Sequence, residues 1–534
     1  MLNVVIPANR PVVPFDQSGE FRTLVNAEGL KPRAVRGAAV TMVCQVVAFV
    51  IQLAGSLVLA RLLSPTDFGI VTMVTTFSLL FMNFGVNGFT EAILQRDTID
   101  RSLASNVFWI NVTVALFLTL GFALAGPLLA HFYGDARLAA IAVMISASIL
   151  ITSLSVSHLA LLKRAMSFTA VAVNDVLGRA ASVVVSVVLA WLSYGYWSLV
   201  AGAVAQPIAL TAGAWILCRW IPDRPRRHAG TWPMVRFAVN TYGHFTTNYV
   251  TRNLDNLLVG WFFGPQALGF YKRAYDLTVL PVGQLSGPLQ AVAMPTLSRL
   301  ADDPERYRRY VLRSLSTVAF LGMGIGAAFA IIGKDLFLLL FGPKWQESGR
   351  LFTFFAPGMG SMMIYMTYSY IHLSIGKPDR LLRWGLAELI AMALMFFVGV
   401  KFGPTGVAVA WTASSWVLIV PALWYAGRPA GVRVADMIGA CWRYALAGGV
   451  AAVITVVTVS AFPELAPMRG QWLAPLARSI ISSGLFVTLY LGIVVALYNG
   501  LEPIRNLLGL FGNLIPGWRV SEPSRPEPPA VCTL

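Results

Sequence analysis

Charged residues are scarce in this chain. Only 12% of its 534 residues are charged, whereas 57% are hydrophobic, and the mean hydropathy is +0.69. A soluble domain carries about 25% charged residues, and no soluble core could absorb this much apolar surface. The shortage of charge excludes a soluble protein and predicts an integral membrane protein with many spans.

Cysteine, histidine and nucleotide-binding motifs are also scarce. The four cysteines include none in a predicted external loop, so no disulfide is expected. The five histidines show no metal-ligand spacing, and no Walker motif is present. We therefore expect no metal, no cofactor and no enzymatic activity.

Long apolar stretches make up most of the chain. About fourteen of them approach the ~20 residues that a helix needs to cross a bilayer, whereas barrel strands would be near ten residues and alternate in polarity. The predicted fold class is an all-α integral membrane protein with about 14 transmembrane helices. The predicted spans are 38–60, 70–93, 105–130, 138–161, 170–192, 197–218, 237–263, 275–298, 314–341, 349–375, 382–400, 405–427, 440–461 and 476–498.

Lysine and arginine gather in alternate loops, most densely from Arg219 to Arg236 and from Arg299 to Arg313. By the positive-inside rule, this asymmetry predicts that both termini are cytoplasmic. The net charge of +16 then reflects basic loops beside anionic lipid, and we expect no nucleic-acid partner. Residues 1–37 contain no long apolar run before Lys31, so no cleavable signal peptide is expected.

A weak internal repeat divides the first twelve spans. Residues 61–69 recur as residues 261–269, with Pro65 matching Pro265 and Gly69 matching Gly269. Two sets of six helices related about the membrane normal are typical of transporters. The predicted parts are a cytoplasmic tail (1–37), a six-helix bundle (38–218), a basic linker (219–236), a second pseudo-symmetric six-helix bundle (237–427), two C-terminal helices (428–498) and a Pro-rich cytoplasmic tail (499–534).

Three motifs make the sequence recognisable, at residues 59–69, at residues 84–96 and at residues 252–275 around Asp255. Together they resemble Wzx-type polysaccharide exporters of the multidrug/oligosaccharidyl-lipid/polysaccharide (MOP) superfamily. The resemblance covers residues 30–430. It implies a V-shaped pair of six-helix bundles in the bacterial inner membrane.

The resemblance also implies a function. Such proteins flip a polyprenyl-pyrophosphate-linked oligosaccharide across the membrane by alternating access, for exopolysaccharide, capsule or O-antigen (lipopolysaccharide) synthesis. The implied partners are that lipid-linked substrate, membrane lipids, and a polysaccharide polymerase with its chain-length machinery. One alternative is a multidrug or lipid-precursor exporter of the same fold. Another is a membrane-embedded polysaccharide polymerase or transferase, although the longest external gap, 462–475, is short for a catalytic segment.

The seventh predicted span carries a polar stripe. Its five residues are spaced by 4, 4, 4 and 3 positions, which places them within an arc of roughly 120° on a helix. Intramembrane charges face a cavity or a partner, so the stripe either lines the transport path or holds a local ion pair between Arg252 and Asp255. Its members are Asn240, His244, Asn248, Arg252 and Asp255.

Other intramembrane polar residues are weaker candidates. Asp175 and Arg179 in the fifth span form either a local i, i+4 ion pair or a cationic site for pyrophosphate. Glu388 and Glu91 are candidate ion-coupling sites, or else residues that simply reach the interface. For the lone intramembrane histidine His158, a hydrogen-bonded structural role is favoured over a proton relay.

Overall fold

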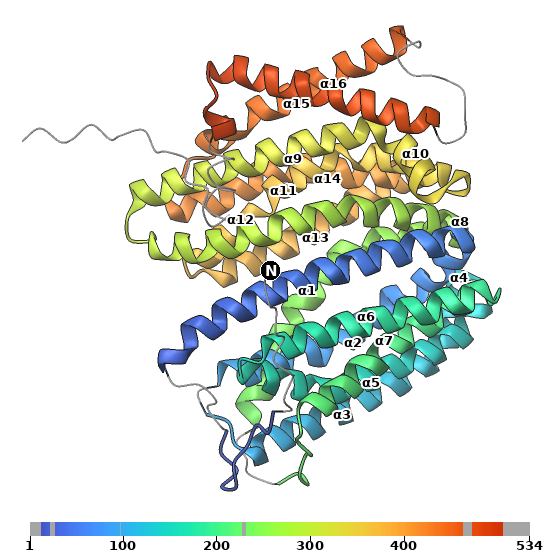
Figure 1. The fold of residues 1–534 in the computed structure, drawn as a ribbon, viewed down its shortest axis with the longest axis vertical. Coiled ribbons are helices and arrows are strands. Elements are labelled where there is room, and N and C mark those ends of the chain that lie inside the picture. The colour runs from blue at the N-terminus through green and yellow to red at the C-terminus, as the bar shows by residue number, and fades with distance from the viewer. Residues whose placement is uncertain (1–11, 22–26, 97, 227–230, 463–472, 506–534) are drawn as a thin grey trace, which may run out of the picture. The chain divides into compact units, whose positions relative to one another are not determined.

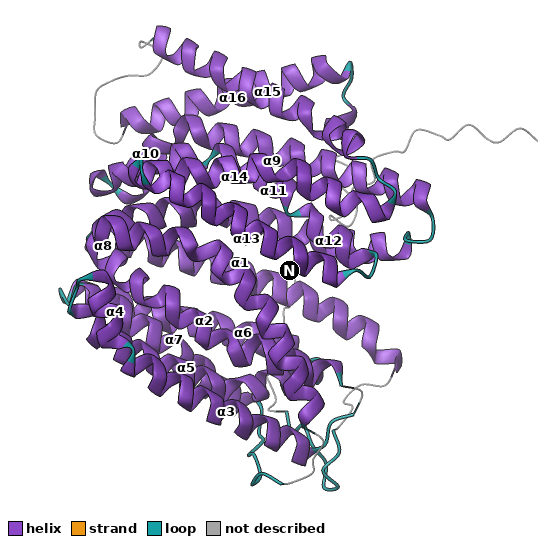
Figure 2. Cartoon of the chain, turned by 180° about the vertical axis from the view of Figure 1, so that it is seen from behind, coloured by secondary structure: helices purple, strands orange, loops and turns teal. Residues whose placement is uncertain are grey.

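The computed structural model describes residues 12–21, 27–96, 98–226, 231–462 and 473–505. These residues are helical almost throughout, and within them only isolated β-bridges occur (Figure 2). The prediction of an all-helical membrane protein is confirmed. The helices of the first part of the chain are α1 (Ala27–Leu62), α2 (Pro65–Gln95), α3 (Arg101–Leu124), α4 (Gly126–Tyr133), α5 (Arg137–Arg164), α6 (Phe168–Trp191) and α7 (Tyr196–Leu217).

The second part of the chain begins with an unusually long helix. It consists of two helical segments that meet at a kink at Gly264, where φ is 78° and ψ is −178°, and the two segments share one label. The helices here are α8 (Trp232–Arg299), α9 (Pro304–Phe341), α10 (Gln346–Phe355), α11 (Pro357–Tyr365), α12 (Thr367–Ser374), α13 (Pro378–Val400), α14 (Gly403–Gly427), α15 (Val434–Ala461) and α16 (Leu473–Tyr498), with 3₁₀ turns η1 (Pro343–Trp345) and η2 (Arg428–Ala430).

Eleven of the described helices are long and apolar enough to cross a membrane. Three predicted spans, 237–263, 275–298 and 349–375, are not among them. The first two belong to α8, which carries many polar and charged side chains, and the third is divided among the short helices α10, α11 and α12. The segments that depart from the prediction are therefore polar or broken.

Local sequence explains the sharp turn between α1 and α2. Ser64 caps α2, with its side chain accepting from the Asp67 N–H, while the Asp67 carboxylate accepts from the Ser64 N–H at 2.9 Å. Pro65 follows at the first helical position, where its missing N–H costs no hydrogen bond. This capping box ends one helix and starts the next within two residues.

The described helices group into two compact units. Unit 1 comprises Met1–Thr278, Gly333–Phe355 and Asp379–Ser414, and unit 2 comprises Val279–Ile332, Ala356–Pro378 and Ser415–Leu534. The unit boundaries fall inside α8, α9 and α14, so each unit mixes residues from distant parts of the sequence. The division into bundles at 219–236 is not tested by this grouping and stays a prediction.

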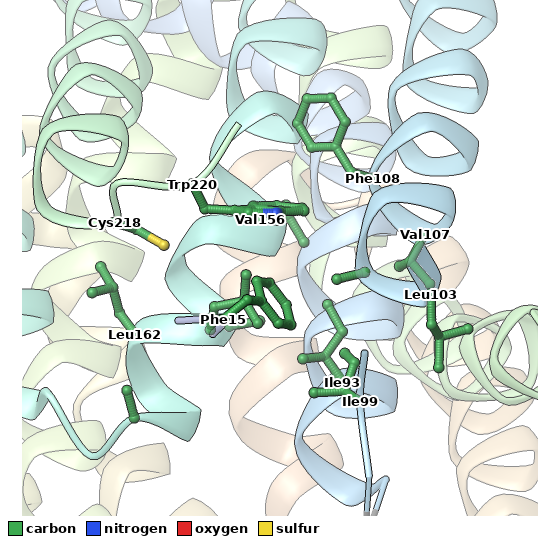
Figure 3. Packing of buried hydrophobic residues seen from close by; sticks show 14 of the residues in the cluster. Phe15, Ile93, Ile99, Leu103, Val107, Phe108, Val156, Leu162, Cys218 and Trp220 are labelled. Carbon is green, nitrogen blue, oxygen red and sulfur yellow. The ribbon is translucent and has the colours of Figure 1, made fainter. Parts of the chain in front are cut away.

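In unit 1, α5 packs against α2, α3, α4 and α7, while α6 packs against α1 and α7 (Figure 1). One end of this group is closed by a segment from the predicted N-terminal tail. The Val12 N–H donates to the Leu217 carbonyl at 2.8 Å, and Phe15 lies in an apolar cluster with Trp220 (Figure 3). Part of the tail therefore belongs to the packed core.

In unit 2, α15 and α16 run side by side (Figure 1). The Tyr490 hydroxyl of α16 donates to the Phe320 carbonyl of α9 at 2.7 Å. Arg308 of α9 donates to the Asp436 carboxylate of α15 at 2.9 Å. Both C-terminal helices are thus tied to α9 by specific polar contacts.

Candidate functional site

The predicted polar stripe lies on α8, and the structure separates it into an accessible part and a buried part. Asn248 is exposed and Arg252 is half-buried, with the Arg252 Nε donating to the Asn248 amide oxygen at 3.2 Å. Asp255 is only 1% exposed. It accepts a hydrogen bond from the Tyr271 hydroxyl at 3.0 Å, from beyond the kink at Gly264.

Among the described residues, the structure shows no local ion pair between Arg252 and Asp255. Among the described residues each of the two has a different partner, Asn248 for the arginine and Tyr271 for the aspartate. Because the Asn248 amide is neutral, it does not offset the positive charge of the Arg252 guanidinium, and this charge can attract an anionic ligand. Asn240 and His244 belong to α8, but their side chains lie outside the described part of the structure.

The second predicted pair forms as a local contact on α6. The Arg179 Nε donates to the Asp175 carboxylate at 3.0 Å, with the two side chains 37% and 41% exposed. No hydrogen bond or ion pair joins this pair to α8 among the residues described. A half-exposed pair of this kind holds its partners weakly, so Arg179 remains able to exchange its partner.

The candidate ion-coupling residues are less informative. Glu388 is half-buried on α13, and the side chain of Glu91, on α2, lies outside the described residues. His158 is fully buried, with its Nε2 3.1 Å from the Trp220 carbonyl oxygen. Its ring also stacks on Trp215 at 4.3 Å, which gives this histidine a structural role.

A junction between the segments around Pro65 and Pro265 lies within unit 1, and the sequence indicated only its glycines and prolines. Gly69 of α2 packs against the backbone carbonyl of Pro265, and Gly269 of α8 packs against the backbone carbonyl of Pro65. A Cβ at either glycine would overlap the opposing carbonyl. The exchange is reciprocal, as expected for two copies related by a two-fold axis.

The ends of α1 and α9 cap each other at this junction. The last carbonyls of a helix lack intrahelical donors. The Trp345 Nε1 donates to the Ala60 carbonyl of α1 at 2.7 Å, while the Arg61 Nη2 donates to the Leu339 carbonyl of α9 at 3.1 Å. The end of α1 is therefore completed by a side chain of η1, directly after α9, and the end of α9 by a side chain of α1.

Arg273 lies in this junction and was not among the residues predicted from the sequence. Its side chain is 9% exposed, and its Nη1 donates to the Ser56 Oγ at 2.6 Å. The guanidinium carbon lies 4.2 Å from the ring centroid of Phe68 and 5.3 Å from that of Trp345. The Nη2 has no hydrogen-bond partner among the described residues.

The signal for Arg273 in the sequence was ambiguous. Lys272 and Arg273 are adjacent basic residues, and the sequence does not show which of the two is enclosed. Lys272 pairs instead with Asp276, one turn further along α8. Only the aromatic side chains brought from α2 and η1 decide which of the two cations is enclosed.

Comparison with known proteins shows which family the chain belongs to. A profile of the family described as "Polysaccharide biosynthesis protein" matches residues 58–350, more than half of the chain. The chain belongs to this family. These residues contain α8, the stripe and the junction apart from Ser56. The protein is a Wzx-like polysaccharide transporter, not an enzyme, so the polymerase or transferase alternative does not hold.

The sequence of the transporter is similar to those of two named bacterial proteins. It is 24% identical to the succinoglycan biosynthesis transport protein ExoT of Rhizobium meliloti (strain 1021), over 62% of this chain and 68% of that protein. It is 22% identical to the lipopolysaccharide biosynthesis protein WzxC of Escherichia coli (strain K12), over 60% of this chain and 65% of that protein. Each alignment thus spans about two thirds of the relative's length.

Solved structures show the fold of the transporter. The lipid II flippase MurJ in an inward closed conformation matches 88% of this chain and 99% of its own, with a TM-score of 0.69 and 13% identity. An inward-facing multidrug resistance MATE transporter matches 73% of this chain and 98% of its own, with a TM-score of 0.58 and 13% identity. The transporter therefore has the MOP fold.

Proposed function

We propose that this transporter flips a polyprenyl-pyrophosphate-linked oligosaccharide across the bacterial inner membrane by alternating access. The headgroup of such a substrate is large, polar and doubly phosphorylated, so its path must be hydrated and carry positive charge. The polyprenyl tail can remain in lipid while the headgroup crosses. No covalent chemistry is needed for the transfer.

The observation that carries this proposal is the pairing of Arg252, an intramembrane cation that donates a hydrogen bond to a neutral amide. An arginine costs about 2.5–3.5 kcal/mol at the centre of a membrane helix on insertion scales. No carboxylate among the described residues pairs with Arg252, although Asp255 is only three residues away on the same helix. We take Arg252 as a phosphate-binding cation, with Asn248 as its positioning neighbour and Arg179 as a second cation nearer the cytoplasm.

The full architecture belongs to the same proposal. We place fourteen helices in the membrane, as two pseudo-symmetric six-helix bundles (38–218 and 237–427) and two C-terminal helices, with both termini cytoplasmic. In that arrangement the junction at Pro65, Pro265 and Arg273 lies at the external end and closes it in an inward-facing state. The polymerase and chain-length machinery remain proposed partners.

The test is a flipping assay in proteoliposomes with a fluorescent polyprenyl-pyrophosphate oligosaccharide. The wild-type protein should move the lipid to the opposite leaflet, where an added glycosidase or reductant can reach it. A glycerophospholipid and a small cationic drug serve as competing cargoes. Transport of the drug in preference to the lipid-linked sugar would replace this proposal by multidrug export on the same fold.

A further inference from the structure

A cavity of about 250 Å³ lies within unit 2, between α9, α15 and α16. It is separate from the stripe on α8, and six of its eight lining residues carry polar side chains. The lining consists of Arg313, Ser316, Thr317, Phe320, Tyr444, Tyr498, Glu502 and Pro503. The lining combines a cation, a carboxylate and four hydroxyl groups with apolar ring surface, which suits an occupant that is partly polar.

The cavity walls are fixed by contacts among the three helices. Ser316 and Tyr444 share a hydrogen bond of 2.9 Å between their hydroxyls, and Tyr444 stacks on Tyr498 with 5.1 Å between ring centroids. Beyond Tyr498 the chain reverses through Asn499, whose φ is 50°. The following Gly500 N–H donates back into α16, to the Val495 carbonyl at 3.2 Å. This reversal brings Glu502 to the cavity.

Side chains next to the cavity are of the kinds expected at the level of the lipid headgroups. Trp442 on α15 is 46% exposed, and the Arg443 guanidinium lies 4.9 Å from the ring centroid of Tyr498. Exposed tryptophan, tyrosine and arginine concentrate at the membrane–water interface. This end of α9 also carries the basic cluster from Arg299 to Arg313, which the positive-inside rule assigns to the cytoplasmic side.

The lining favours a ligand that carries both a positive and a negative charge. A simple anion would be attracted by Arg313 but repelled by Glu502. A simple cation would be attracted by Glu502 but repelled by Arg313. We propose that this cavity binds the headgroup of a zwitterionic phospholipid of the phosphatidylethanolamine class. Its phosphate lies against Arg313 and the hydroxyls of Ser316 and Thr317, while its ammonium lies against Glu502 and the tyrosine rings.

The volume of the cavity distinguishes the proposed phospholipid headgroup from the larger headgroup of the transported substrate. At ~30 Å³ for each water molecule, the cavity holds about eight waters, which suits a phosphoethanolamine group and excludes an oligosaccharide. The acyl chains of the lipid would stay in the bilayer beside α16. The proposed role of the two C-terminal helices is therefore to hold a structural lipid, and this does not depend on what the protein transports.

Native mass spectrometry of the purified full chain tests the proposal. The detergent-solubilised protein is titrated with dioleoyl-phosphatidylethanolamine, with dioleoyl-phosphatidylglycerol, and with soluble phosphoethanolamine as competitor. We expect one ethanolamine lipid to bind about tenfold more tightly than the glycerol lipid, because a hydrogen bond to a charged group corresponds to roughly that factor. Millimolar phosphoethanolamine should displace it, whereas inorganic phosphate should not.

Variants distinguish the two charges. Glu502→Gln should remove the preference for ethanolamine over glycerol lipid, while Arg313→Gln should weaken both lipids and Arg313→Lys should retain binding. The matched control is the Glu305→Gln/Arg309→Gln double variant, which makes the same charge changes on exposed positions of α9 outside the cavity. Unchanged lipid preference in a folded Glu502→Gln protein, or equal binding of both lipids by the wild type, would overturn the proposal.

Discussion

Arg252 and Arg273 stand on the same helix, α8, yet their surroundings are opposite. Arg252 is half-buried and donates a hydrogen bond to the exposed amide of Asn248, whereas Arg273 is enclosed by aromatic rings and bound to Ser56. A cation in a rigid aromatic enclosure is suited to holding structure together. A cation with one weak neutral partner is suited to binding and releasing an anion. The pair therefore separates the closed junction from the proposed path.

The largest effect is expected at the glycines of the junction. Gly69→Ala and Gly269→Ala should each destabilise the folded protein by about 3 kcal/mol, the upper part of the usual range for overpacking, because the added methyl group meets a backbone carbonyl that no side-chain rotation can move away. Thermal unfolding and the yield of monodisperse protein measure this effect.

The matched control is Gly121→Ala in α3, where an added Cβ would have no neighbouring atom within 4 Å. Alanine is favoured over glycine in a helix, so this variant should be at least as stable as the wild type. Equal stability of Gly69→Ala and Gly121→Ala would show that the two copies of the repeat do not meet at Pro65 and Pro265.

The second expected effect concerns the cation of the junction. Arg273→Met keeps the volume but removes the charge, so it should weaken closure without leaving a buried charge. A new cysteine at buried Ser348, whose Oγ donates to the Phe270 carbonyl at 2.9 Å, reports on opening. In a background without native cysteines, Ser348→Cys should react with a thiol reagent about tenfold faster when Arg273 is methionine, because each ring–cation contact contributes ~0.5–2 kcal/mol.

Arg273→Lys is the comparison for this experiment. A lysine keeps the charge but loses the planar group that stacks on the rings, so labelling should be intermediate. Identical labelling rates in the arginine, lysine and methionine proteins would mean that Arg273 does not hold the junction closed.

The third prediction concerns the accessible cation. Arg252→Ala should abolish flipping of the lipid-linked oligosaccharide in proteoliposomes while thermal stability stays within ~0.5 kcal/mol of the wild type, since the side chain makes one exposed hydrogen bond. Arg252→Lys should restore part of the activity. Arg309→Ala, an exposed arginine of α9, is the control that should flip normally. A normal rate in Arg252→Ala would remove this residue from the path.

The next prediction concerns how accessible two positions on α8 are to a thiol reagent, where a smaller difference is expected. Asn248→Cys should react with a membrane-impermeant thiol reagent, whereas Asn256→Cys should not, because Asn248 is exposed and Asn256 is buried. Arg252 itself is left intact in both proteins. Labelling at 256 with none at 248 would place the path on the other side of the helix.

The smallest effect is expected at the local ion pair of α6. Asp175→Asn should change the free energy of unfolding by less than about 0.5 kcal/mol, because both partners are more than a third exposed and solvent screens the pair. Arg179→Ala should be equally mild in stability but should slow flipping. If Arg179→Ala flips at the wild-type rate, the pair is only a surface contact and the path lies elsewhere.

Some features of the site were readable from residue order alone. The turn at Pro65 follows from Ser64 and Asp67, whose side chains cap a helix start wherever that pattern occurs. The stripe on α8 follows from helical periodicity. What periodicity cannot supply is a partner from another element, so it suggested Arg252 for Asp255 and could not suggest Tyr271, which lies beyond a kink.

The sequence by itself determined that this protein lies in a membrane and that it is helical, and it drew attention to Pro65 and Pro265 through the predicted repeat. Those properties depend on composition and on spacing along one chain segment. Tertiary structure alone decided which cations are enclosed and which are accessible, since Arg273 is buried only by rings from Phe68 and Trp345. Burial and pairing are properties of elements brought together from distant positions, and no local pattern specifies them.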